Sequence, residues 1–183
     1  LQTQQGRPIV SNVFEILDTY GVSLEDNLVL DEFCNNITVT QQRGFFRVNT
    51  AVAYPFFPII RDFGDHMMVG GLEQVHVLFP SEITYDSSDS ASTMQPLFTT
   101  SDRSGIAAGF FNLGPIENPI FQTLTESGRN VGVYATSKVG ATTSTSQLVL
   151  ISDSSFLLDD AGGRMPENVV FVMNASDVLI GDR

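Results

Sequence analysis

The clearest pattern in the chain is a run of apolar residues that ends abruptly in a polar turn. Residues Leu148 to Ile151 are all apolar, and two of the four are β-branched. Such a run is typical of a strand covered on both faces, as the central strands of parallel sheets are. Ser152 to Ser155 follow where the carboxyl end of that strand is expected, and open α/β sheets bind ligands at this edge. The pattern therefore predicts an architecture and a place for a site.

Two other segments have the apolar spacing of helices. Between residues 13 and 20 the apolar side chains form a stripe, and Gly21 ends it. Residues 169–179 follow helical spacing too, and Pro166 stands where the first turn of a helix tolerates proline. Because several of these residues are β-branched, a strand at residues 169–173 is the alternative.

The remaining apolar segments are short and are separated by turn residues. Strands are predicted at residues 27–30, 37–40, 45–49, 75–79, 96–100 and 130–135, with loops at 81–94 and 138–146. Residues 51–60 are apolar and aromatic, but Pro55 and Pro58 interrupt them. Proline cannot donate to a strand ladder, so this segment is predicted to be an edge or a covering loop.

These elements predict one α/β domain over residues 1–183. The expected fold is a Rossmann-like three-layer domain with a mainly parallel central sheet. Because the first predicted element is a helix, we expect the chain to be a fragment that lacks its first βα unit. It would have been excised from a longer, membrane-anchored protein.

The composition is that of a folded, acidic protein. Hydrophobic residues make up 42% of the chain and charged residues 16%, which is globular rather than disordered. The formal net charge of −12 disfavours nucleic acid, and it disfavours docking on anionic lipid through a basic patch. Cys34 is the only cysteine, so neither an intrachain disulfide nor a multi-cysteine metal site can form.

The acidic residues near the polar turn are candidate metal ligands. Asp153, Asp159 and Asp160, with Asp182, could supply the oxygen ligands that calcium or magnesium prefers. Their spacing does not match an EF-hand loop, and acidic loop residues are more often solvated. We therefore expect no bound metal and no cofactor.

A hydrolase would need a nucleophile beside a base. Ser154 or Ser155 could be combined with His66 or His76, but the G-x-S-x-G pattern is absent around these serines. We therefore expect the protein not to be an enzyme.

Two groups of residues are predicted to bind other molecules. The ligand-binding candidates at the carboxyl edge of the sheet are Ser101, Asp102, Arg103, Ser104, Asp153, Ser154 and Ser155. Tyr54, Phe56 and Phe57 are candidates for a partner-binding face, because the neighbouring prolines keep this segment irregular and near the surface. The alternative for these rings is the core.

Several segments, in order along the chain, resemble passages of one known family. They are residues 16–22 followed by 26–31, the Y-P-F-F-P element at 54–58, residues 71–81, 97–101 with 103–104, 148–156, and Asn174 with 178–179. The family is the auxiliary, substrate-binding-like component of an uncharacterised ABC-type transport system involved in gliding motility, the GldG-like family.

The resemblance implies a non-catalytic binding domain on the periplasmic or extracytoplasmic face of the bacterial inner membrane. Its partners would be the permease and ATPase subunits of the transporter, reached through the parent protein. Membrane contact would come only through segments absent from this chain. The alternative function is a small-molecule or glycan sensor that binds at the carboxyl edge of the sheet.

Overall fold

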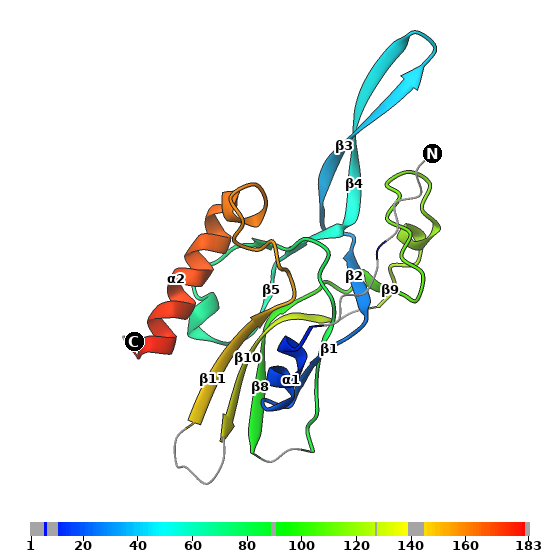
Figure 1. Cartoon of the computed structure of the whole chain (residues 1–183). Coiled ribbons are helices and arrows are strands. Elements are labelled where there is room, and N and C mark those ends of the chain that lie inside the picture. Colours follow the sequence, from blue (N-terminus) through cyan, green and yellow to red (C-terminus); the bar gives the residue numbers. More distant parts are fainter. Residues whose placement is uncertain (1–5, 7–10, 89–90, 127, 139–144, 182–183) are drawn as a thin grey trace.

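The computed structural model describes residues 6, 11–88, 91–126, 128–138 and 145–181. These residues form small antiparallel β-sheets with two α-helices, as Figure 1 shows. The strands are β1 (Val22–Leu24), β2 (Asn27–Asp31), β3 (Cys34–Arg43), β4 (Phe46–Ile60), β5 (Asp62–Phe63), β6 (Val75–His76), β7 (Ile83–Tyr85), β8 (Ser92–Thr99), β9 (Ser104–Ala108), β10 (Asn130–Lys138) and β11 (Thr145–Ile151). The helices are α1 (Val13–Asp18) and α2 (Pro166–Ile180), with 3-10 turns at Met67–Val69, Pro119–Gln122 and Gly162–Arg164.

The predicted Rossmann-like fold with a mainly parallel sheet is wrong. The strand orders are β11-β10-β8-β5, β3-β4-β6, β2-β9 and β1-β7, and every strand pair among the described residues is antiparallel. Residues 148–151 lie in β11, at the edge of the four-stranded sheet.

The apolar run in β11 reflects cover on both faces of an antiparallel sheet. Val149 and Ile151 pack on the cluster that includes the core residues of α2, whereas Leu148 and Leu150 pack on the cluster that includes Leu17 of α1. Two-sided burial is common in parallel sheets, but it does not set strand direction. Only six residues, 139–144, separate β10 from β11, which is too few for a parallel crossover.

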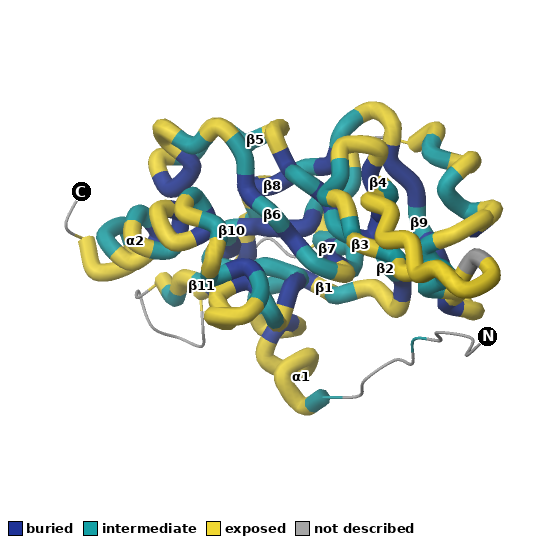
Figure 2. Tube along the Cα trace, turned by 90° about the horizontal axis from the view of Figure 1, so that it is seen from above, coloured by how far each residue is buried: buried dark blue, intermediate teal, exposed yellow. Residues whose placement is uncertain are grey.

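The largest hydrophobic cluster joins α2 to the strands beneath it. Phe98 of β8 lies at its centre, with its ring centroid 4.6 Å from that of Phe171 in α2 and 6.1 Å from that of Phe156. On the other side of the four-stranded sheet, Leu17 is the buried residue of α1, and the rest of this helix is largely exposed (Figure 2). The two helices therefore anchor opposite faces of the sheet through a few apolar residues.

Most predicted elements exist, although their extents differ. The helices predicted at residues 13–20 and 169–179 are confirmed, so the alternative strand at 169–173 is wrong. Five of the six predicted strands lie largely within β2, β3, β4, β8 and β10. At residues 75–79 only the first two residues form a strand, and the predicted loop at 81–94 contains β7. Part of the loop predicted at 138–146 lies outside the described residues.

The segment predicted to be an edge or covering loop is the inner half of the 15-residue strand β4. The β3–β4 register shifts between Cys34, which pairs with Pro58, and Asn36, which pairs with Ala53. Pro55 falls within this irregularity, where no ladder hydrogen bond is required of it. The prolines therefore mark a break in the register and not the end of the strand.

Beyond this break, β3 and β4 form an arm that extends away from the rest of the molecule (Figure 1). We define the arm as residues 36–53, whose ladder runs from the Asn36–Ala53 pair to the Arg43–Phe46 pair. Gly44, at φ +64°, begins the two-residue turn at its tip. A positive φ at the first turn position matches the twist of a hairpin, and glycine adopts it without strain.

The segment from Glu73 to Phe79 is held along both of its edges. On one edge, the backbone N–H groups of Val77 and Phe79 donate to carbonyls of β4, at 3.1 and 2.8 Å. On the other edge no strand of the described residues pairs with it, and side chains take the place of one. The Asn168 amide of α2 accepts from the N–H of His76 at 2.9 Å and donates to its carbonyl at 2.8 Å.

We expect Asn168→Ala to destabilise the protein by about 2–4 kcal/mol, because it leaves two partly buried backbone groups of His76 unpaired. The matched control is Asn174→Ala in the same helix, whose amide makes longer bonds of 3.3 and 3.5 Å at a more exposed position. The control should lose no more than about 1 kcal/mol. Urea unfolding measures both, and equal losses would contradict this account of Asn168.

Candidate ligand-binding cavity

A cavity of about 680 Å³ lies where several strand ends meet. Its apolar lining consists of Phe14, Leu24, Leu28, Leu78, Phe79, Phe111, Leu113 and Ile151. Its other lining residues are Gly6, Glu25, Asp26, Asn27, Ser81, Ser152, Asp153, Ser154 and Ser155. A mostly apolar cavity of this volume that also holds polar groups has the make-up of a small-molecule site.

Asp153 forms part of the cavity wall and is held in place by backbone groups. Its Oδ2 accepts from the N–H of Leu78 at 2.8 Å, and its Oδ1 accepts from the N–H of Ser155 at 2.6 Å. Burial raises the pKa of this carboxyl, and the two backbone hydrogen bonds oppose that rise. The side chain therefore ties the end of β11 to the segment that follows β6.

Phe79, which also lines the cavity, has a strained backbone. Its φ of +50° lies in the left-handed region, which costs a bulky residue about 1–3 kcal/mol. The strain is offset by the bond from its N–H to Phe56 at 2.8 Å and by edge-on ring contacts with Tyr54 and Phe57. Strain of this kind concentrates at functional sites, so Phe79 marks this wall of the cavity as a candidate.

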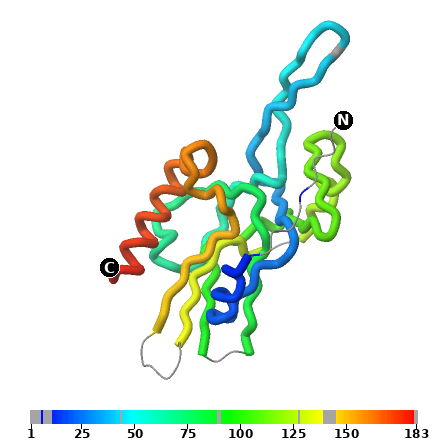
Figure 3. The backbone as a smooth tube through the Cα atoms, in the orientation of Figure 1, coloured from blue at the N-terminus to red at the C-terminus, as the bar shows by residue number. Residues whose placement is uncertain are grey.

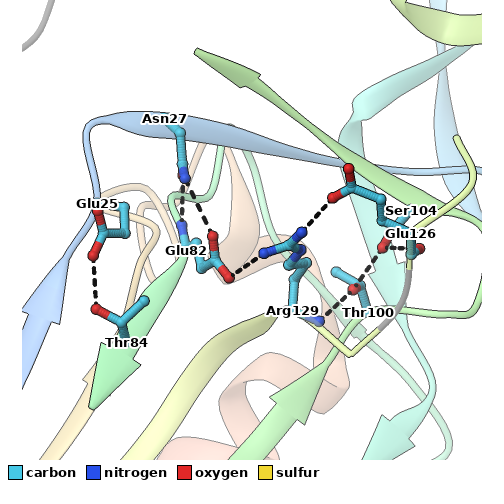
Figure 4. A network of polar contacts seen from close by, with 8 residues as sticks. All are labelled: Glu25, Asn27, Glu82, Thr84, Thr100, Ser104, Glu126 and Arg129. Carbon is cyan, nitrogen blue, oxygen red and sulfur yellow. Dashed lines mark hydrogen bonds and ion pairs between the residues drawn. The ribbon is translucent and has the colours of Figure 1, made fainter. Parts of the chain in front are cut away.

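A polar network borders the cavity at Asn27 (Figure 4). The Asn27 Oδ1 accepts from the N–H of Glu82 at 3.0 Å, and the Glu82 carboxylate pairs with Arg129 at 2.7 Å. Arg129 also pairs with Glu126. Hydrogen bonds to these two carboxylates raise the pKa of Arg129. Its charge is already compensated, so this arginine is not available to an anionic ligand.

The charged residues among the described cavity lining are all acidic. Glu25, Asp26 and Asp153 contribute carboxyl groups, and no lysine or arginine is among the lining residues that the structure describes. Carboxylates repel anions and attract cations at short range. The lining therefore favours uncharged or cationic ligands over phosphates and other anions.

The structure separates the two groups of predicted ligand-binding residues. Asp153, Ser154 and Ser155 line the cavity, whereas residues 101–104 do not. The N–H and hydroxyl of Ser101 donate to Asp31 at 2.7 and 2.8 Å, which fixes the turn between β8 and β9.

The other three predicted residues, 102–104, are either exposed or bound to residues outside the cavity lining. Ser104 is fully buried, and its hydroxyl donates to the carbonyl of Glu126 at 2.6 Å. Asp102 is exposed, and Arg103 forms a surface ion pair with Glu32 at 2.6 Å. The described contacts of residues 101–104 therefore fix the turn between β8 and β9 against neighbouring segments.

The aromatic residues predicted as a partner-binding face lie in a packed cluster. Tyr54 and Phe56 are buried, and Phe57 is half-buried. The Tyr54 ring meets Phe57 edge-on at 4.9 Å, and its hydroxyl donates to the carbonyl of Leu113 at 2.7 Å. The most exposed phenylalanines among the described residues are instead Phe45 and Phe46.

The two histidines considered for a hydrolase contact residues other than Ser154 and Ser155. The Nδ1 of His66 accepts from the N–H of Met68 at 3.2 Å, and its ring stacks on Tyr134 at 4.8 Å. The Nδ1 of His76 lies 2.9 Å from the amide nitrogen of Asn35. Within the described residues, neither histidine is hydrogen-bonded to Ser154 or Ser155.

The proposed metal ligands are not brought together. Asp159 and Asp160 are exposed, whereas Asp153 is buried, and Asp182 lies outside the described residues. No group of three or more His, Cys, Asp or Glu side chains in the described part of the chain is placed to share a metal ion.

Sequence reasoning missed Phe79, which lines the cavity next to the Leu78–Asp153 contact, and the exposed arm tip. Phe79 follows a predicted strand and gives no sign of its positive φ. The strands predicted at residues 37–40 and 45–49 were found, but their reach beyond the rest of the molecule was not predicted. The absence of any acidic residue between Cys34 and Arg61 was the available signal that this segment differs from the rest of the chain.

The fold and cavity define a β-rich domain with an apolar, acidic-edged cavity. The sequence profile of the family described as an ABC-type uncharacterized transport system, auxiliary component, matches residues 1–175. The chain belongs to this family. Comparisons with curated proteins and with solved structures give no match. Among the described residues, no helix combines the length and hydropathy needed to cross a lipid bilayer.

The raised pKa of Asp153 has a consequence for stability that can be measured. A carboxyl whose pKa is higher in the folded protein contributes stability that is fully present below its ordinary value of 3.8. That contribution is lost as the pH rises through the folded-state pKa. The free energy of unfolding of the wild type should therefore fall relative to Asp153→Asn as the pH rises from below 3.8.

Urea unfolding of both proteins between pH 3.5 and about 7 tests this expectation. Asp102→Asn, which removes one negative charge at an exposed position, is the control for the change in net charge. A difference that grows in favour of the wild type over this range would contradict the assigned direction.

Proposed function

We propose that this chain is a non-catalytic binding domain of an auxiliary protein in an ABC-type transport system. In this proposal the domain lies on the extracytoplasmic side of the bacterial inner membrane, in a system linked to gliding motility. Its contact with permease and ATPase subunits runs through the parent protein. Family membership supports the transport context.

The cavity bounded by Phe79 and Asp153 is the observation that carries the binding role. It is large enough for a small molecule, and its polar groups come from the end of β11 and from the segment between β1 and β2. A binding role also fits Asp153, because both of its carboxyl oxygens are hydrogen-bonded to backbone N–H groups and hold this part of the cavity wall in place. The expected ligand is mostly apolar and is uncharged or cationic.

Ligand binding should raise the stability of the protein in a thermal-shift experiment. A ligand at about 100 times its dissociation constant adds about 2.7 kcal/mol. We expect stabilisation by neutral apolar compounds or by apolar compounds that carry an ammonium group, and none by nucleotides. Ser154→Trp, which fills space at the exposed side of the cavity, should abolish the shift, whereas Ser87→Trp outside the cavity should retain it.

Equal shifts in both tryptophan variants would place the ligand elsewhere, and nucleotide binding would contradict the charge argument. Turnover of esters, peptides or nucleotides at enzyme-like rates by the purified protein would contradict the non-catalytic role.

A further inference from the structure

The arm, residues 36–53, ends in two solvated aromatic rings. Phe45 and Phe46 have relative exposures of 102% and 75%, and Figure 3 shows the hairpin extending beyond the rest of the backbone. Phenyl rings in water are unfavourable, and a two-stranded ribbon is only marginally stable alone. The tip therefore presents apolar surface that an occupant would cover favourably.

One face of the arm continues the apolar character of the tip. Val48 and Phe46 stand on the same face as Val39, because Val39 pairs with Thr50 and the side chains alternate along each strand. The opposite face carries polar side chains such as Thr40, whose hydroxyl donates to Asn49 at 2.7 Å, and Arg47 lies on this face too. The outer arm is thus an amphipathic ribbon, and its apolar face leads to the tip.

The charge of this segment is opposite to that of the rest of the chain. Residues 34–61 contain three arginines and no aspartate or glutamate, although the whole chain has a net charge of −12. Arg43 and Arg47 flank the two phenylalanines in the sequence. Arg47 is exposed and forms no ion pair with any described residue. An aromatic tip flanked by arginine is suited to an apolar layer bordered by anions, as in an acidic phospholipid bilayer.

The size of the tip favours lipid over a protein surface. Two phenylalanine side chains bury roughly 300–500 Å². A stable protein interface buries about 1,200 Å² or more over both partners, or about 600 Å² on each, so the tip alone is too small for one. A bilayer needs no shape complementarity and accepts a narrow protruding loop.

The arm is long enough to keep the acidic rest of the protein away from anionic lipid while its tip touches the bilayer. Eight residue pairs at about 3.4 Å per residue give a reach of roughly 27 Å. Charges in water are screened within about 8 Å at physiological ionic strength. A body held three screening lengths from the bilayer is repelled only weakly by anionic lipid.

We propose that the arm tip inserts into the interfacial region of a bilayer that contains anionic phospholipid. Phe45 and Phe46 enter the boundary between head groups and acyl chains, and Arg47 lies at the level of the lipid phosphates. This contact is made by the chain itself and does not depend on the cavity. Its failure would leave the proposed function intact.

Co-sedimentation with vesicles tests the proposal directly. The intact chain should bind vesicles of phosphatidylcholine with about 30% phosphatidylglycerol, and bind pure phosphatidylcholine more weakly. Phe45→Ser with Phe46→Ser should reduce binding at least tenfold, whereas Phe110→Ser, at another phenylalanine that is 68% exposed, should not. Arg47→Gln should weaken binding to the anionic vesicles about fivefold, and Lys138→Gln should not.

A spectroscopic measurement separates insertion from surface adsorption. The chain contains no tryptophan, so Phe45→Trp introduces a single emitter at the tip. Its emission should shift to shorter wavelength when anionic vesicles are added, and Phe110→Trp should show no shift.

Two results would overturn the proposal. One is vesicle binding that the double serine variant retains, with no emission shift in Phe45→Trp. The other is an emission shift that depends on protein concentration without lipid, because the tip would then be covered by a second copy of the chain. Unchanged circular dichroism and melting temperature of each variant exclude misfolding as the cause of any loss.

Discussion

The structure depends on how one short segment, Glu73 to Phe79, is paired along its two edges. On the β4 side, the N–H groups of Val77 and Phe79 are bound by backbone carbonyls. On the other side, the N–H groups of Gln74, His76 and Leu78 are bound in turn by the side chains of Glu167, Asn168 and Asp153, at 2.7, 2.9 and 2.8 Å. Three side chains therefore do what a neighbouring strand would do in a continuous sheet.

This arrangement joins the fold to the cavity. Glu167 and Asn168 lie in the first turn of α2, and Asp153 follows two residues after β11, so the segment is fixed to the helix and to the end of the four-stranded sheet at once. The chain then turns through the strained Phe79, and the cavity lies beside that turn. A buried polar group without a partner would be costly here, so the same residues that close the core also fix one wall of the cavity.

Much of the local structure could be predicted from the sequence, but the topology could not. The spacing of apolar residues located both helices and most strands, because it reports which faces are covered. It could not report strand direction, and the run at residues 148–151 is equally consistent with an antiparallel edge strand between two covered faces. The short connection to β10 was the better signal, since hairpins need few residues and crossovers need many.

The candidate site was predicted in part, for a related reason. Asp153 to Ser155 were placed correctly at the end of an apolar strand, and they line the cavity. Ser101 and Ser104 were grouped with them on the assumption that parallel strands end at one edge. β8 and β11 are both antiparallel to β10 and therefore end at the same edge of the sheet, but Ser101 after β8 is bound to Asp31 and does not line the cavity. The partners of Asp153 are backbone groups, which no pattern of side chains reveals.

Native-state hydrogen exchange tests most directly whether side chains replace a strand along Glu73–Phe79. If they do, the amides of Gln74, His76 and Leu78 will exchange as slowly as those of Val77 and Phe79, which are bound to β4. Fast exchange at the three even-numbered positions, with slow exchange at the other two, would show an open edge and contradict the account.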